Sequence, residues 1–236
     1  MMVEIHTLEL GPMENLVYLI EDSQSATAAV VDPAWEVGKI LQLVAERELK
    51  ITTILLTHGH SDHINGVEQL QQESGAEVYI SRQDASFFGL EEMGWNLFDA
   101  PFSHSLGESE ITAIATPGHT PGGTCYYLGG NWGVRSGNLL TGDTLFVYGC
   151  GRCDLEGGDA VAMYHSLRGL VERFDPQTAV FPGHNYSTQI SSTLAQERSG
   201  NPFLQFDSEE EFVHYRMDLH DRIRSAPYGP LGASTA

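Results

Sequence analysis

The chain has 236 residues, with 12 Lys and Arg against 32 Asp and Glu, so its formal net charge is −20. Nucleic acids and anionic membrane surfaces both require clustered basic side chains, and this composition therefore argues against either partner. Hydrophobic residues make up 41% of the chain, which is enough to bury a core and excludes disorder by composition.

The first part of the chain predicts strands that alternate with helices. Short apolar runs within residues 2–33 predict strands, residues 37–49 carry apolar side chains at helical spacing, and residues 51–57 form a β-branched run typical of a buried strand. Residues 62–73 predict a second helix, and residues 77–81 predict another strand. This alternation indicates the α/β class.

The second part repeats the pattern in outline. Residues 160–174 form an amphipathic helix, and short strands are predicted at residues 111–116, 124–128, 139–140 and 179–181. Two more helical stretches follow, at about residues 189–198 and 208–224. The last dozen residues are rich in Pro, Gly, Ala and Ser, and we expect this end to be disordered. No linker divides the chain, so we expect a single domain.

Several features point to a soluble protein. No apolar run approaches the roughly 18 to 20 residues of a transmembrane helix. The first residues include an acid and no basic region, unlike a secretory signal. Cys125, Cys150 and Cys153 are too few for a disulfide framework. We therefore expect a cytoplasmic location.

Histidines and aspartates gather in the loops that follow the predicted strands. The hexapeptide HGHSDH holds His58, His60, Asp62 and His63. Alternate side chains of an extended loop share a face, so His58 and His60 can bind one ion, and Asp62 and His63 a neighbouring one. Imidazole nitrogens and carboxylate oxygens are natural ligands of borderline divalent metals. Three more candidates follow later strands: His119, Asp143 and His184.

The segments THGHSDH, TPGHTPGG, TGDTLF and PGHNY, in this order, resemble the metallo-β-lactamase superfamily over residues ~15–200. The resemblance implies an αββα sandwich over residues 1–200, with residues 201–236 as a short C-terminal helical tail. It implies two divalent ions, zinc or alternatively iron or manganese. One ion would be bound by His58, His60 and His119, the other by Asp62, His63 and His184, and Asp143 would bridge both.

Within the superfamily, the segment TGDTLFVYGCGRCD resembles the glyoxalase II group, the hydroxyacylglutathione hydrolases. This resemblance implies hydrolysis of a small-molecule thioester by a metal-bridging hydroxide, with Asp62 and Asp143 as catalytic residues. Asp62 could transfer the proton. The same segment resembles persulfide dioxygenases, which share these ligand residues but bind a single iron. In this chain the corresponding iron ligands would be His58, His119 and Asp143. Pro121 and Cys153 stand where that group has Asp and Thr, which favours the hydrolase.

The substrate contacts are less well defined by the sequence. Arg152 stands where the glyoxalase II group has a basic residue that binds glutathione, and Tyr186 and Asn185 follow the last ligand candidate. Asp154 replaces the tyrosine that the group usually has two residues after this basic position, so hydrolysis is better supported than glutathione as the thiol carrier. An acyl-pantetheine on an acyl carrier protein is an alternative substrate, although acidic carrier proteins would be repelled by this charge. A non-enzymatic binding protein on the same fold is a third hypothesis.

Overall fold

The computed structural model describes residues 3–129, 136–223 and 227–232. Internal contacts divide the chain into two compact units, Met1–Ile114 and Ala115–Ala236. Among the described residues, no helix combines the length and the apolar character that crossing a bilayer demands.

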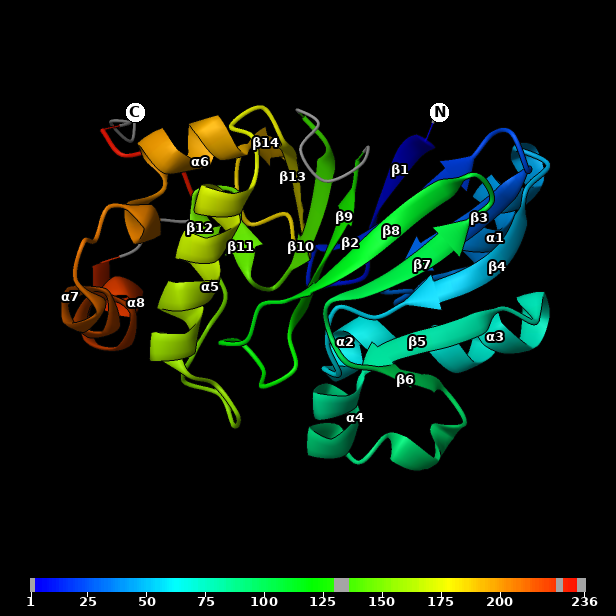
Figure 1. Ribbon diagram of the computed structural model, residues 1–236, viewed down its shortest axis with the longest axis horizontal. Helices are drawn as coiled ribbons and strands as arrows, with labels where there is room; N and C mark the ends of the chain where they lie inside the picture. The colour runs from blue at the N-terminus through cyan, green and yellow to red at the C-terminus, as the bar shows by residue number, and fades with distance from the viewer. Residues whose placement is uncertain (1–2, 130–135, 224–226, 233–236) are drawn as a thin grey trace. The chain divides into compact units, whose positions relative to one another are not determined.

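The first unit is built on a six-stranded sheet (Figure 1). Its strands follow the order β1 (Val3–Leu10), β2 (Asn15–Asp22), β3 (Thr27–Val31), β4 (Lys50–Leu55), β5 (Glu77–Ser81) and β6 (Asn96–Phe98). β1, β2 and β3 pair antiparallel, whereas β3 to β6 pair parallel. β7 (Phe102–Leu106) and β8 (Ser109–Ala115) form an antiparallel hairpin. Parallel strands require crossover connections, which explains the helices between them.

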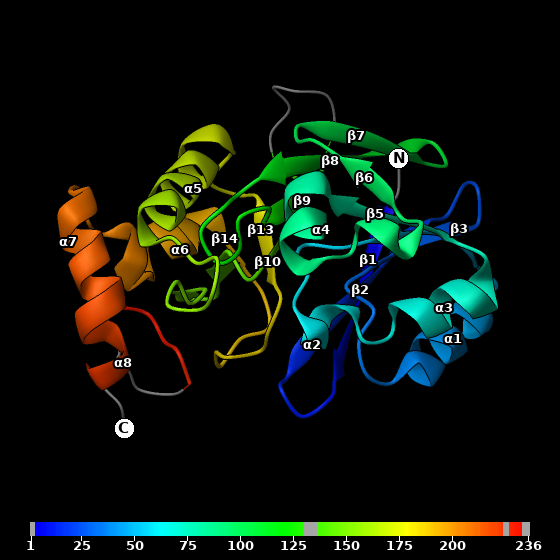
Figure 2. The same cartoon turned by 90° about the horizontal axis from the view of Figure 1, so that it is seen from below.

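Helices α1 (Val37–Glu46) and α3 (Val67–Ser74) lie side by side against this sheet (Figure 2). α1 buries Val37, Ile40 and Val44, the stripe expected from its spacing. The predicted helix over residues 37–49 is shorter than expected, since Glu48 has a φ of 55° and the chain turns there. α2 (Ser61–Ile64), α4 (Arg82–Phe88) and the turn η1 (Glu91–Met93) complete the unit.

The single helix predicted over residues 62–73 is wrong, because the structure has two helices, α2 and α3, separated at Gly66. The Gly66 N–H donates to the Pro33 carbonyl at 3.1 Å, and a Cβ at Gly66 would lie 2.7 Å from that oxygen. The Asn65 side chain accepts from the Trp35 N–H at 2.6 Å. These contacts with the loop after β3 end α2 at Ile64.

In the second unit, four strands lie side by side in the order β14-β13-β10-β9. The unit also has one long helix, α5 (Ala160–Arg173). The strands are β9 (Thr124–Leu128), β10 (Asn138–Gly142), β13 (Ala179–Pro182) and β14 (Ser192–Thr193), and β11 (Leu145–Phe146) pairs with β12 (Gly149–Cys150). α5 begins where the Asp159 carboxylate accepts from the N–H groups of Val161 and Ala162. Its buried side chains pack with residues of β11, β12 and the later helices.

The later helices are α6 (Leu194–Gly200), η2 (Pro202–Leu204), α7 (Glu209–His214), the π-helical turn η3 (Tyr215–Leu219) and α8 (His220–Ile223). α6 begins later than predicted, because Thr193 and Gln196 form a capping box that fixes its start. Beyond α8, the Tyr228 N–H donates to the Tyr186 carbonyl at 2.7 Å and the Leu231 N–H to the Gly200 carbonyl at 2.9 Å. Residues 233–236 of the predicted disordered end lie outside the described residues.

Candidate metal centre

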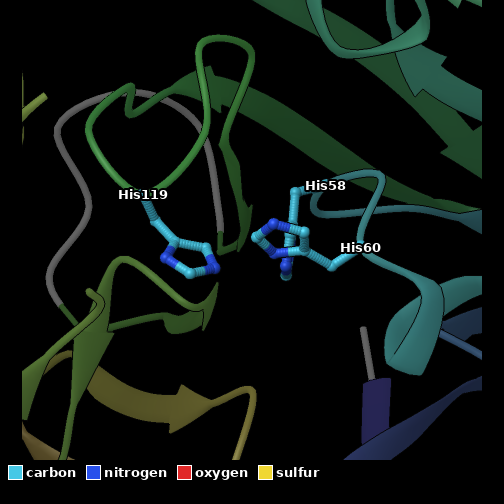
Figure 3. Close-up of side chains that lie close together, drawn as sticks. All are labelled: His58, His60 and His119. Atoms are coloured by element: carbon cyan, nitrogen blue, oxygen red, sulfur yellow. The ribbon is translucent and has the colours of Figure 1, made fainter. Parts of the chain in front are cut away.

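The segment after β4 carries four of the predicted ligands. His58 and His63 are buried, with 2% and 1% of their surface exposed. His60 precedes α2 as its N-cap residue, and Asp62 lies in the first turn of that helix. The His58 ring centroid lies 4.8 Å from that of His60 and 4.1 Å from that of His63. The hexapeptide thus brings three imidazoles together within the first unit. Figure 3 shows His58 and His60 on the loop after β4, and His119 on the loop after β8.

A hydrogen-bond network around Asp32 determines which nitrogen of His58 and His63 carries the proton. The Asp32 carboxylate accepts from the Thr57 N–H at 2.7 Å, from the Thr57 hydroxyl at 2.6 Å and from His63 Nδ1 at 3.0 Å. Because the Thr57 hydroxyl donates its one proton to Asp32, His58 Nδ1 must donate to Thr57 Oγ1 across their 3.0 Å contact. In the neutral rings, Nε2 of both histidines therefore carries the lone pair that a metal requires.

Asp62 is oriented by β2. Asn15, the first residue of that strand, donates its side-chain amide to Asp62 Oδ2 at 3.1 Å and to the Asp62 carbonyl at 3.2 Å. The Asn15 side-chain oxygen accepts in turn from the Trp35 indole at 2.7 Å. Asp62 Oδ2 lies 3.5 Å from His63 Nε2, so this carboxylate is held beside an imidazole by partners outside the hexapeptide.

Helix α4 supports the same loop from another direction. Asp84, which is completely buried, accepts from the Gly59 N–H at 3.0 Å. The Phe88 ring packs so closely on Gly59 that a Cβ there would lie 2.3 Å from it, and the ring meets His60 edge to face at 5.2 Å. Any side chain at position 59 would therefore displace the loop or the Phe88 ring.

In the second unit, Asp143 lies between two histidines. His119 Nε2 and His184 Nε2 lie 3.4 and 3.5 Å from Asp143 Oδ2. His119 Nδ1 donates to the Arg152 carbonyl at 2.8 Å, which leaves the lone pair of the neutral ring on Nε2. Asp143 follows β10 directly, and the Gly183 backbone approaches so closely that a Cβ there would lie 2.4 Å from Asp143 Oδ1. The buried strands β10 and β13 thus determine the position of this carboxylate.

The donor chemistry of each unit fits a divalent cation. The Asp143 carboxylate oxygen is an acceptor only, and the neutral His119 ring presents a second acceptor to it, so a cation between them satisfies both. Asp62 and His63 form the same kind of pair in the first unit. Ligand histidines characteristically donate their other ring nitrogen to a carboxylate or carbonyl, as His63 and His119 do here.

The predicted substrate residues have partners within the second unit. Arg152 forms a bidentate ion pair with Asp154, with Nε to Oδ1 at 2.9 Å and Nη2 to Oδ2 at 2.7 Å. The Tyr186 ring stacks on His184 with centroids 4.7 Å apart and an interplanar angle of 7°. Asn185 is half-buried between these two residues in the chain.

Sequence reasoning missed the residues that orient the ligands. Asp32 lies at the end of the strands predicted within residues 2–33 and carries no functional prediction, and neither does Asn15 or Asp84. In the structure Asp32 adopts a φ of 51°, and aspartate is one of the few residues other than glycine that visit this region.

Residues 10–184 match the model of the metallo-beta-lactamase superfamily. The chain therefore belongs to this superfamily, and it is a hydrolase or a related metal-dependent enzyme with the α/β fold of the family. The predicted fold class and the predicted superfamily are confirmed.

Three relatives match most of the chain. The probable polyketide biosynthesis zinc-dependent hydrolase PksB of Bacillus subtilis is 34% identical over 86% of this chain and 87% of its own. A hydroxyacylglutathione hydrolase of Gloeobacter violaceus is 32% identical over 89% and 96%. The mitochondrial persulfide dioxygenase ETHE1 of Bos taurus is 32% identical over 82% and 72%. Among solved structures, ETHE1 from Myxococcus xanthus is 32% identical, with a TM-score of 0.81 over 92% of this chain and 91% of that chain.

Replacing Asp32 with asparagine is expected to weaken zinc binding by about 10- to 100-fold, the usual effect of losing a hydrogen-bond partner of a metal ligand. Asparagine tolerates the same backbone conformation, but it has one acceptor oxygen where the Asp32 carboxylate uses both to accept three hydrogen bonds from Thr57 and His63. The amide nitrogen of asparagine would therefore face at least one of these donors. Competition with a chromophoric chelator measures the dissociation constant.

The matched control is Asp22→Asn. Asp22 is equally buried and accepts hydrogen bonds from Ser25, Glu108 and Ser109, none of which contacts a predicted ligand in the described network. This variant should lower the melting temperature and keep the zinc affinity. Unchanged zinc affinity in Asp32→Asn would contradict the role assigned to Asp32.

Proposed function

We propose that this enzyme hydrolyses a thioester, using two divalent metal ions. The proposed ligands are His58, His60, Asp62, His63, His119, Asp143 and His184, with Asp143 shared by both ions. Bound metal would lower the pKa of a water molecule to near neutrality and supply a hydroxide nucleophile. Zinc is the proposed metal, with iron or manganese as alternatives.

The observation that carries this proposal is Asp62, a carboxylate directly followed by the ligand candidate His63. Asn15 holds Asp62 Oδ2 at 3.1 Å, and the Asp62 side chain is 15% exposed, so it can exchange a proton with water. A thiolate leaves readily without protonation, so Asp62 needs only to hold the proton released by the attacking water. The similarity to a hydroxyacylglutathione hydrolase over 96% of its length supports the same chemistry.

The thiol carrier is the other part of the substrate, and the arginine side chains indicate which kind of carrier the site accepts. The Arg152 guanidinium is paired with Asp154, and Arg216 in the C-terminal helices is 3% exposed, so neither offers an open cation for glutathione. We propose a small acyl thioester as the substrate. The similarity to a probable polyketide biosynthesis hydrolase makes acyl-pantetheines, alone or on an acyl carrier protein, the second class to test.

A panel of thioesters tests the proposal. Metal-loaded protein is assayed with S-lactoylglutathione, other acyl-glutathiones, acyl-pantetheines and an acyl carrier protein, with free thiol as the readout. Turnover that is lost with a chelator and restored by zinc is the expected result. No turnover of any thioester by protein that holds two metals per chain would refute it.

The second candidate function is persulfide dioxygenase, favoured by the 32% identity to bovine ETHE1. Pro121 and Cys153 count against it. About one iron per chain, together with oxygen uptake on glutathione persulfide, would favour this function over hydrolysis.

Replacing Asp154 with asparagine is expected to keep the metals and to change substrate affinity alone. Hydrogen bonding to Arg152 lowers the pKa of Asp154 to about 2. A lowered carboxyl pKa means that the pair is present above the ordinary value of about 3.9 and is lost only as the pH falls toward 2. The pair is therefore intact throughout a neutral assay, and only the substitution releases Arg152.

The released guanidinium should lower KM for anionic thioesters such as acyl-glutathiones and leave KM for neutral thioesters unchanged. Steady-state kinetics on one substrate of each kind measures the difference. An equal change for both would mean that Arg152 does not act as an anion anchor.

A further inference from the structure

Three buried polar side chains of the C-terminal helices bind the backbone that follows Asp143. Glu197 and Asn201 are completely buried, and Arg216 is 3% exposed. Glu197 accepts from the Tyr148 N–H at 2.9 Å, and Asn201 donates to the Gly149 carbonyl at 3.0 Å. Arg216 Nε donates to the Gly151 carbonyl at 3.1 Å. All three side chains lie beyond residue 184, where the match to the superfamily model ends.

The backbone that they hold, residues 146–152, packs directly on two proposed ligands. A Cβ at Gly151 would lie 1.9 Å from the Asp143 carbonyl oxygen and 3.2 Å from His119 Cβ. The next carbonyl along the chain, that of Arg152, accepts from His119 Nδ1 at 2.8 Å. One peptide unit therefore separates the atom that Arg216 holds from the atom that orients the His119 ring.

Arg216 is a buried cation, and its remaining contacts offset the unfavourable burial of its charge. Its Nη1 donates to Asp221 Oδ1 at 3.3 Å and lies 3.1 Å from His220 Nδ1. The guanidinium lies over the Phe203 ring, 5.9 Å from its centroid. Burial of an arginine is unfavourable without such partners, and here they accompany the hydrogen bond from Nε to the Gly151 carbonyl.

The neighbouring thiols do not replace this role. Cys150 Sγ and Cys153 Sγ both point to the Gly151 carbonyl, at 3.5 and 3.7 Å. Burial raises the pKa of Cys153 to about 12 and that of Cys150 well above its ordinary value. Both groups are therefore neutral thiols and weak donors, which leaves Arg216 as the strong donor to this carbonyl.

We propose that Arg216 is a positioning residue of the metal centre. By holding the Gly151 carbonyl, it places the Arg152 carbonyl that orients His119, and it makes the C-terminal helices part of the metal site. The inference needs a metal bound through His119 and does not depend on the substrate. It can therefore be tested separately from thioester hydrolysis.

The test compares metal binding in Arg216→Met with that in Phe212→Leu. Phe212 is completely buried in the same helices and packs on Tyr164, Phe203 and Phe206, so it serves as a control for loss of stability alone. The zinc dissociation constant is measured by chelator competition at a temperature where every variant is folded. The absorption spectrum of the Co²⁺-loaded protein reports the geometry of the ligands.

Arg216→Met should weaken zinc binding by about 10- to 100-fold and change the Co²⁺ spectrum, and Arg216→Lys should recover part of both. Phe212→Leu should lower the melting temperature and leave both measurements unchanged. If Arg216→Met loses stability but keeps the zinc affinity and the Co²⁺ spectrum of the unmodified chain, the proposal is wrong. Should Arg216→Met fail to fold, Arg216→Lys is compared in the same way, and unchanged values there overturn the proposal.

Discussion

Asp143→Asn is expected to lose most of the bound metal and nearly all turnover. The Asp143 carboxylate lies 3.4 and 3.5 Å from the Nε2 atoms of His119 and His184, and it is the one proposed ligand shared by both ions. An amide of the same shape coordinates weakly and offsets none of the cationic charge. The metal affinity should fall by more than about 100-fold, which is the upper end of the usual effect when a metal ligand loses a hydrogen-bond partner.

Metal per chain, measured by mass spectrometry of the purified protein, and turnover on every active substrate check this expectation. Asp154→Asn is the control for metal content, because it makes the same chemical change in a carboxylate that pairs with Arg152. Both metals and a near-normal rate in Asp143→Asn would show that Asp143 does not bridge. The parent chain should hold two metals as a hydrolase and one iron as a dioxygenase, so counting metals also separates the two candidate functions.

Gly151→Ala is expected to distort the metal centre as strongly as loss of a ligand. A Cβ at this position would lie 1.9 Å from the Asp143 carbonyl oxygen, which is backbone and cannot move without displacing Asp143 itself. The Gly151 N–H also donates to the Thr144 carbonyl at 3.4 Å, and this hydrogen bond would have to break for the segment to shift away. Zinc binding should weaken by more than about 100-fold, beyond the effect of losing one hydrogen bond to a ligand.

Gly169→Ala gives the matched control. Gly169 is exposed in α5, and a Cβ at this position would meet no neighbouring atom within 4 Å. Alanine in a helix is more stable than glycine by about 0.5–1 kcal/mol, so this variant should raise the melting temperature and keep the zinc affinity. Circular dichroism and chelator competition on both variants provide the comparison, and tight zinc binding by Gly151→Ala would mean that the loop is more adaptable than the structure indicates.

The positions of the helices show how far periodicity alone can predict a fold. The apolar stripe of residues 160–174 matches α5, whose ends are set by neighbours in the sequence such as Asp159. The break at Gly66 was not predicted, because it depends on the Pro33 carbonyl, which approaches from a distant loop. The segment between β5 and β8, with α4, β6 and β7, lacks strong periodicity and was also missed.

The sequence by itself determined the kinds of metal-binding residue and their places after the strands, since HGHSDH, GHT, GD and PGH are local patterns that follow apolar runs. Only the tertiary structure decided how these side chains are oriented. Asp32 is 31 residues from His63, Asn15 is 47 residues from Asp62, and Arg216 is 65 residues from Gly151. Spacing along a strand and its loop depends on the local backbone, whereas the partner of a hydrogen bond depends on which distant segments pack together. The proton positions on His58, His63 and His119 follow from that packing.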